Sequence, residues 1–228
     1  MTPPSESTPV SQPTVSVIIP CKDAGQWLGA QLDALRAQDY PGPLEVIVAD
    51  NGSMDDSKRV ASDRPGVRVI DASERRGPNF ARNLGLSHAT GEVILTCDAD
   101  DVVDAHWVTA MVAALGEHDL VAGRLDYESL NPGQGAAVEE RLEKDSRLGF
   151  LPAAATCNFG IRAEVLRALG GWDETLDYGF EDAELSWRAQ LAGYRFGRAD
   201  DAVVRYRLRT TTAGVTKQAY QGAQNLPV

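Results

Sequence analysis

Short apolar runs alternate along the first half of the chain with longer segments that carry apolar residues at helical spacing. Continuous runs rich in β-branched residues are typical of strands that are buried on both faces. Strands joined through helices pair in parallel, because the helix returns the chain to the same end of the sheet. The alternation therefore predicts an α/β fold, with a mostly parallel central sheet and helices on both faces.

Four strands and three helices are predicted before residue 119, at residues 15–20, 44–50, 67–72 and 92–98 (strands) and 25–39, 78–89 and 104–118 (helices). In the last of these helices Trp107, Met111 and Leu115 share one face. The pattern then loosens, and we expect the second half to extend the same sheet. Its predicted elements are strands at 119–127 and 202–209, a short helix that begins at 163 and is ended by Gly170-Gly171, and a helix at 181–194.

Composition divides the chain into one domain with two tails. Residues 1–13 contain four of the 12 prolines and little apolar bulk, which predicts a disordered tail. The domain is expected to cover residues 14–210, and residues 211–228 to form a C-terminal tail or partial helix.

Charge and apolar patterning restrict the partners. A net charge of −11 argues against nucleic acid, which would favour a basic surface. No apolar run approaches 18 residues, so no transmembrane segment is expected. The N-terminus lacks the pattern of a signal peptide, and Cys21, Cys97 and Cys157 lack disulfide or metal spacing. These features indicate a cytoplasmic protein with reduced thiols, and leave peripheral attachment to a membrane open.

Acidic residues follow several predicted strands. Asp98, Asp100 and Asp101 end the fourth strand, and Asp50 and Asp23 follow two others. Each residue alone is explained by a turn or a helix cap. Together they load the carboxyl edge of the sheet, where ligands bind in such folds, with charges that repel unless a cation offsets them. Carboxylate oxygens suit Mn²⁺ or Mg²⁺, which in turn suit a nucleotide diphosphate.

Four motifs in order resemble family-2 glycosyltransferases of the GT-A fold, a Rossmann-like α/β fold. They are "VSVIIPCKDAGQWL" (15–28), "EVIVADNGSMDDS" (45–57), "GPNFARNLGL" (77–86) and "GEVILTCDADD" (91–101). The resemblance extends over about residues 14–207 and keeps the order and spacing of the family.

The resemblance implies roles for the acidic edge. "DADD" is similar to the family's DXD motif, so Asp98 would face the ribose of a nucleotide-sugar and Asp100 would hold Mn²⁺ or Mg²⁺. Asp50 would contact the base, near Pro20 and Asp23.

The roles of two further residues, Asn51 and Arg82, are less specific. Asn51 stands where the family often has a second Asp, and with Gly52 it is expected to shape the turn. Arg82 is either a surface arginine packed along its helix, a donor to the nucleotide, or a cation that offsets the acidic residues.

"YGFEDAELSWR" (178–188) resembles the family's ED motif, whose Asp is the general base. That residue is Asp182, with Glu181 beside it. The alternative is that both only open a helix and complement its dipole. The helix N-terminus is expected to keep Asp182 ionised, and a base of this kind in an inverting family implies direct displacement with inversion.

Residues 156–179 match the region that lines the sugar and acceptor in relatives. Trp172, Tyr178 and Phe180 either stack on a sugar or pack in the core. Asn158 either bonds a sugar hydroxyl or caps a turn.

Two departures from the family concern the last strand and processivity. Arg205 or Tyr206 stands where many relatives place a metal-binding His. The QxxRW motif and membrane helices of processive synthases are not found, which predicts transfer of one sugar per encounter.

The loop at residues 128–146 is predicted to be a lid with hinges at Gly133 and Gly135.

The sequence thus predicts a metal-dependent, inverting, non-processive glycosyltransferase. A UDP-sugar is the favoured donor, and the acceptor is a saccharide, a lipid-linked molecule or a small molecule. The alternatives are a non-catalytic module that binds nucleotide-sugars and a sugar nucleotidyltransferase. The latter would need a Gly-rich, Arg-containing loop after the first strand, where "PCKDAGQW" offers one glycine and one lysine.

Overall fold

The computed structural model describes residues 12–135, 138, 150–176 and 179–209. Most of both predicted tails, and of the predicted lid at 128–146, therefore lies outside the described residues. All described strands and helices fall between Val15 and Arg205, inside the predicted domain.

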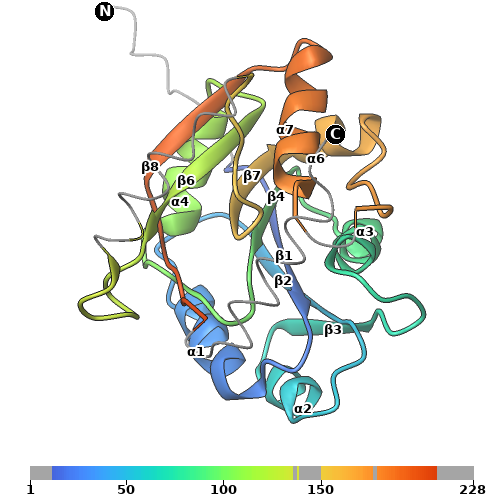
Figure 1. Ribbon diagram of the computed structural model, residues 1–228, viewed down its shortest axis with the longest axis vertical. Coiled ribbons are helices and arrows are strands. Elements are labelled where there is room, and N and C mark those ends of the chain that lie inside the picture. Colours follow the sequence, from blue (N-terminus) through green and yellow to red (C-terminus); the bar gives the residue numbers. More distant parts are fainter. Residues whose placement is uncertain (1–11, 136–137, 139–149, 177–178, 210–228) are drawn as a thin grey trace, which may run out of the picture.

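One eight-stranded sheet runs through the molecule in the order β3-β2-β1-β4-β7-β6-β8-β5 (Figure 1). Its strands are β1 (Val15–Cys21), β2 (Leu44–Asp50), β3 (Val67–Asp71), β4 (Val93–Cys97), β5 (Val102–Val103), β6 (Leu120–Asp126), β7 (Asn158–Arg162) and β8 (Phe196–Arg205).

The sheet has a parallel half and a mixed half. Strands β3, β2, β1 and β4 are parallel to one another, whereas β7 is antiparallel to both β4 and β6. Strand β8 then pairs in parallel with β6. The prediction of an α/β fold whose mixed second half extends one sheet is confirmed.

Side chains of each strand alternate between the two faces of the sheet, so an apolar strand presents apolar side chains on both. Helices cover both faces and bury these side chains. Val17 and Ile19 pack in a cluster with α1 (Gly25–Arg36) and α4 (Trp107–Leu115). Ile18 between them points to the other face, which is covered by α3 (Pro78–His88), α6 (Ala163–Ala168) and α7 (Glu181–Leu191). A Cβ atom on Gly85 would lie 2.5 Å from Cγ2 of Ile18, so only glycine lets α3 approach β1 this closely.

Several elements agree with the sequence. Trp107, Met111 and Leu115 are all buried on α4, and Pro78 lies in the first turn of α3. Cys21, Cys97 and Cys157 are buried free thiols. Within the described ranges, no helix combines the length and hydropathy needed to cross a bilayer.

The predictions were wrong where an element is short or polar. Strand β8 begins at Phe196 rather than residue 202, because its polar first part pairs with β6 across a register shift between Gly123 and Arg124. Strand β7 falls in a segment that the sequence suggested only as a sugar-contact region. Two further elements, α2 (Ser57–Ser62) and β5, were not predicted at all.

Candidate active site

Acidic residues from separate strands meet at the carboxyl edge of the parallel half. Asp50 is the last residue of β2 and pairs in register with Cys21 at the end of β1. Asp98 follows directly on β4, and β1 and β4 are parallel neighbours. The predicted convergence of Asp50 and Asp98 on one edge therefore follows from parallel pairing.

Arg82 connects this edge with the start of α7. Its side chain is 4% exposed, so the alternative of a surface arginine is wrong. Nη2 lies 3.6 Å from Oδ1 of Asp98, and Nη1 lies 3.7 Å from Oε1 of Glu181. Nη1 also donates a hydrogen bond to Oδ1 of Asn79, one helical turn away on α3. A single buried guanidinium thus offsets two carboxylates that are far apart in the sequence. Asp98 belongs to the DXD-like motif and Glu181 to the ED-like motif.

The chain beyond β8 crosses the acidic loop. We call residues 206–209 the C-terminal strap. The backbone N–H of Arg207 donates to Oδ1 of Asp101, and its Nε donates to the carbonyl oxygen of Asp100. Nη1 of Arg209 lies 2.7 Å from Oδ2 of Asp100.

The sequence did not single out Arg207 or Arg209. The residue it did consider, Arg205, pairs with Asp104 at 3.3 Å instead. The alternation of Arg205, Arg207 and Arg209 was an available signal, because a period of two is typical of extended backbone.

Burial raises the pKa values of two acidic side chains in the loop after β4, Asp98 and Asp101. Loss of solvation raises the pKa of Asp98 to about 6, although Arg82 opposes the shift. Burial and the nearby charge of Asp98 raise the pKa of Asp101 to about 9. Oδ2 of Asp101 is buried without a hydrogen-bond partner in the described chain. In this loop, Oδ2 of Asp101 thus remains available to a further donor or a cation.

Asp182 lies in the first turn of α7, as predicted. Its Oδ1 accepts a hydrogen bond of 3.2 Å from the hydroxyl of Thr156. The expectation that the helix N-terminus keeps Asp182 ionised is wrong in direction. Burial and the charge of Glu181 raise its pKa to about 7, against the opposing effect of Arg82. A carboxylate with a pKa near the working pH is suited to accept a proton.

The residues predicted to contact the base lie at or just beyond the carboxyl ends of β1 and β2. Asp50 is 5% exposed, and its Oδ1 has no hydrogen-bond partner among the described residues. Asp23 has a left-handed backbone with φ 51°, and its carboxylate accepts the N–H of Met54. Pro20 is half-buried beside them on β1.

Asn51 was expected to shape the turn after β2, but its side chain holds the loop after β3 instead. Its side-chain amide donates to the carbonyl oxygens of Ala72 and Arg75, and its Oδ1 accepts the N–H of Gly77. All these contacts are with backbone, so Asn51 fixes the approach to α3.

Asn158 and Trp172 are both buried, at 1% and 2% exposure. Oδ1 of Asn158 accepts the indole N–H of Trp107, and its amide donates to the carbonyl oxygens of Arg124 and Ala202. Trp172 packs in the cluster beneath α3, α6 and α7. For Trp172, burial in this cluster favours core packing over contact with a sugar. The side chain of Asn158 ties β7 to β6, β8 and α4 rather than capping a turn.

The remaining aromatic candidates are Tyr178, which lies outside the described residues, and Phe180. The ring of Phe180 is half-buried and packs edge-on against Trp187, with centroids 5.2 Å apart. Phe180 precedes the acidic start of α7 and has a left-handed backbone with φ 69°.

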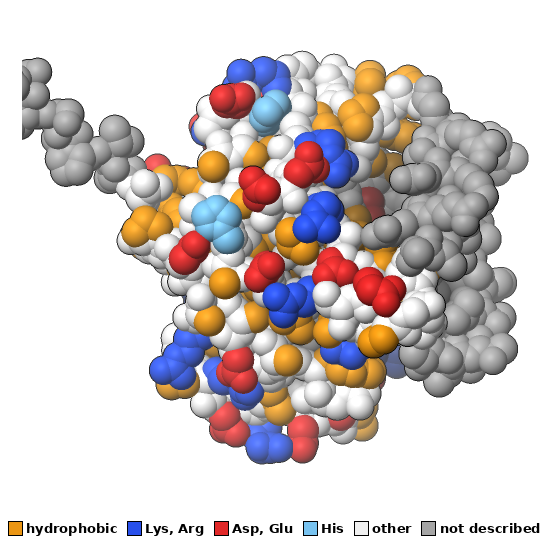
Figure 2. Space-filling model, turned by 90° about the vertical axis from the view of Figure 1, so that its left-hand side faces the viewer, with side chains coloured by type: hydrophobic (Ala, Val, Ile, Leu, Met, Phe, Trp, Pro, Cys, Tyr) orange, Lys and Arg blue, Asp and Glu red, His pale blue; other side chains and the backbone are white. Residues whose placement is uncertain are grey.

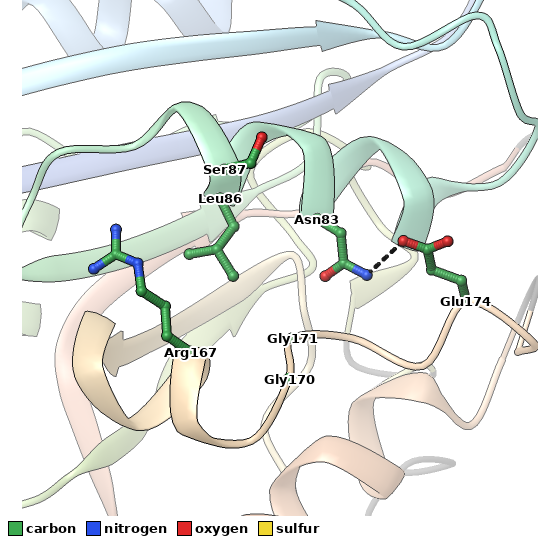
Figure 3. Close-up of a pocket in the computed structure, with 7 residues that line it drawn as sticks. All are labelled: Asn83, Leu86, Ser87, Arg167, Gly170, Gly171 and Glu174. Carbon is green, nitrogen blue, oxygen red and sulfur yellow. Dashed lines mark hydrogen bonds between the residues drawn. The ribbon is translucent and has the colours of Figure 1, made fainter.

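A surface hollow lies between α3 and the loop after α6 (Figure 3). Asn83 points into it and bonds the backbone of Trp172 and the carboxylate of Glu174. The preceding residue, Arg82, contacts the acidic edge instead. The hollow therefore marks where α3 holds the loop that leads toward α7.

The net charge is not gathered on the face that carries α4 and β8. There, acidic and basic side chains are interspersed with hydrophobic ones (Figure 2). The raised pKa values of Asp98, Asp101 and Asp182 therefore come mainly from their burial and not from the number of acidic residues on the surface.

The described residues fit a divalent cation by the chemistry of their donors. Ligand atoms of Asp98, Asp101 and Cys157 lie within 4.8 Å of one another. Asp100, with 12% of its side chain exposed, lies between these aspartates in the chain. Oxygen-rich sets of this kind suit Mg²⁺ or Mn²⁺, whereas the raised pKa of the buried Cys157 thiol disfavours it as a ligand.

A sheet of this order, with acidic residues after β4 and at the start of α7, has the architecture of GT-A glycosyltransferases. The sequence model of glycosyl transferase family 2 matches residues 16–170, more than half of the chain. The chain belongs to this family.

Curated relatives agree with the family. Glycosyltransferase AglE of Haloferax volcanii is 28% identical over 201 residues, covering 84% of this chain and 66% of AglE. The pre-mycofactocin glycosyltransferase of Mycobacterium tuberculosis is 26% identical over 234 residues, covering 94% of this chain and 47% of that protein. The chain thus spans about half to two thirds of the length of these relatives.

Solved structures agree with the fold. The mannosyltransferase PcManGT from Pyrobaculum calidifontis, in complex with GDP-Man and Mn²⁺, superposes with a TM-score of 0.73 at 26% identity, covering 92% of this chain and 61% of that one. TarS 1–349 of S. aureus, in complex with UDP-GlcNAc, has a TM-score of 0.67 at 20% identity, covering 87% of this chain and 59% of that one. The second likeness is one of fold alone.

Proposed function

We propose that the protein transfers one sugar from a nucleotide-diphosphate sugar to an acceptor hydroxyl, with inversion at the anomeric carbon and dependence on Mn²⁺ or Mg²⁺. The observation that carries the proposal is the buried Arg82, which contacts both Asp98 after β4 and Glu181 at the start of α7. This contact supports a site shared by the DXD-like motif and Asp182, the proposed base next to Glu181.

The nucleotide would bind beyond the carboxyl ends of β1 and β2. The unpaired Oδ1 of Asp50 can accept an N–H from the base, with Pro20 and Asp23 beside it. The resemblance favours UDP, whereas the structural neighbour with the higher sequence identity was solved with GDP-Man. Both nucleotides therefore belong in the test.

The metal would be held by Asp100, with Asp98 and Asp101 as neighbouring oxygen donors. When bound, the ion would act as a Lewis acid on the leaving diphosphate. The carboxylates would hold and orient it. Burial raises the pKa values of Asp98 and Asp101, and a bound cation would favour their ionised forms.

Asp182 would act as the base on the acceptor side. Its carboxylate would take the proton of the acceptor hydroxyl as that oxygen attacks the anomeric carbon. Attack on the side opposite the leaving diphosphate inverts the centre. Glu181 would keep Arg82 in place and raise the pKa of Asp182, so the pair works as a unit.

Calorimetry with UDP and GDP tests the metal-dependent donor site. The wild type should bind one of them in Mn²⁺ and lose most of the affinity in EDTA. Asp100→Ala should lose affinity in Mn²⁺ and remain folded, whereas Asp200→Asn, an exposed control paired with Arg198, should bind normally. Equal affinity in EDTA and in Mn²⁺ would contradict the metal's role. Nucleotide-sugar binding without turnover would support a non-catalytic module instead.

A further inference from the structure

The C-terminal strap is anchored along its backbone. The N–H of Tyr206 donates to the carbonyl oxygen of Asp126, and the N–H of Leu208 donates to Oδ1 of Asn131. The amide of Asn131, a residue only 4% exposed, donates in turn to the carbonyl oxygen of Tyr206. The strap is therefore held at both Tyr206 and Leu208, directly before Arg209.

Arg209 itself is held by its side chain. The side chain of Arg209 is 48% exposed, and its Nη1 lies 2.7 Å from Oδ2 of Asp100, whose own side chain is 12% exposed. Within the described chain, Asp100 is the ion-pair partner of Arg209. An ion pair with one half-exposed member contributes little to stability, so it exchanges for a stronger partner at small cost.

We propose that Arg209 is a built-in counter-ion that pairs with Asp100 until a divalent cation binds there, and that it then transfers to the diphosphate of the donor. The inference rests on the proposed function, because it requires Asp100 to bind the cation. A divalent ion at Asp100 repels the guanidinium and offsets the same carboxylate. The diphosphate arrives with negative oxygens, for which the planar guanidinium is a well-matched donor.

The two contacts predict effects of opposite sign for one substitution. In Arg209→Gln the competitor for Asp100 is gone, so Mn²⁺ alone should bind about two- to fivefold more tightly, the range of an exposed ion pair. The same variant lacks a cation for the diphosphate. UDP or GDP in saturating Mn²⁺ should therefore bind about tenfold more weakly.

The matched control is Arg205→Gln. Arg205 lies on β8 and is similarly exposed, at 41%, but its carboxylate partner is Asp104, outside the DXD-like motif. Arg205→Gln should leave both affinities at the wild-type values. Arg209→Lys keeps the positive charge but loses the planar guanidinium that can donate two parallel hydrogen bonds. It should therefore match the wild type with Mn²⁺ alone and bind the nucleotide more weakly.

Titration calorimetry with MnCl₂, first alone and then with UDP and GDP, decides the matter. Tighter Mn²⁺ binding together with weaker nucleotide binding in Arg209→Gln supports the exchange. Unchanged affinities, or weaker Mn²⁺ binding in this variant, overturn it while leaving metal-dependent nucleotide binding intact. A wild type that binds nucleotide and no Mn²⁺ overturns both the exchange and the metal role in the proposed function.

Discussion

Asp182 is the residue on which the proposed chemistry depends most directly. Asp182→Asn keeps the size of the side chain and an acceptor oxygen for Thr156 but cannot take a proton. We expect donor binding to be retained and the transfer rate to fall by at least about a hundredfold, the lower end for a positioned base. Single-turnover kinetics with saturating donor measures this. Glu184→Gln, in the same helical turn, is the control. Wild-type turnover in Asp182→Asn would return Asp182 to a helix-capping role.

The pH dependence of the wild type follows from the same residue. Burial and Glu181 raise the pKa of Asp182 to about 7, so the base is increasingly protonated below that pH. We therefore expect kcat/KM to rise with pH on an acid limb near 7, well above the pKa of an ordinary Asp. A rate profile from pH 5 to 9 at saturating Mn²⁺ tests it. A flat profile between pH 5 and 8 would exclude Asp182 as the titrating base.

At the scale of elements, Arg82 joins α3, β4 and α7. Arg82→Met keeps much of the apolar stem but leaves Asp98 and Glu181 without their shared cation. We expect the nucleotide-free protein to lose about 2–4 kcal/mol of unfolding free energy, because the carboxylates stay partly buried. Urea denaturation in EDTA measures the loss. Arg64→Met removes a more exposed arginine that pairs with Asp33 and should change stability by less than about 1 kcal/mol.

The loop after β4 should give stability an unusual pH dependence. The pKa of Asp101 is about 9 when folded and near 3.8 in the unfolded chain, so the folded state binds the extra proton between these values. Stability contributed by this group is therefore present at low pH and is lost as pH rises toward 9. Asp101→Asn should flatten that loss and be more stable than the wild type at pH 8.

Denaturation in EDTA at pH 6 and pH 8.5 checks the sign. The Asn side chain can still accept the N–H of Arg207 at Oδ1, so the strap contact is preserved. The exposed control Asp200→Asn should follow the wild type at both values. A larger decline with pH in Asp101→Asn than in the wild type would contradict the assigned direction.

Sequence patterns predicted the parallel half of the fold better than the mixed half. The strands β1, β2 and β4 are continuous apolar runs, because both of their faces are covered. Strand β7 reads "NFGIR", too short and too mixed to be distinguished from a loop by periodicity. Its place beside β4 is set by long-range pairing, which no local pattern reports.

For the site as well, the sequence predicted some residues and not others. Asp50 and Asp98 were predicted because each lies at the end of a strand, and Asp182 because its segment resembles the family's ED motif. The burial of Arg82 and the reach of Arg209 to Asp100 depend on how distant segments pack. A local pattern cannot supply such contacts, so the cations of this site were underestimated while its acids were recognised.

At the scale of the whole molecule, ligand binding should appear as global stability. A ligand that binds only the folded state stabilises it by about 2.7 kcal/mol at 100 times its dissociation constant. We expect the melting temperature to rise when Mn²⁺ and the matching nucleotide-sugar are added together. A panel of UDP- and GDP-sugars would identify the donor by the largest shift. The shift should vanish in Asp100→Ala, and a full shift in EDTA would contradict metal dependence.

The antiparallel seam between β4 and β7 has a consequence for chimeric proteins. Parallel strands with the residues proposed for the donor lie on one side, and strands associated with α7 lie on the other. Exchanging residues 150–209 between family members would graft a new acceptor side onto an old donor side. Since Arg82 reaches across to Glu181, a graft is compatible only if it brings its own carboxylate to position 181. Residues 207 and 209 lie in the exchanged segment and contact Asp101 and Asp100, so a graft must also match the donor side at these two positions.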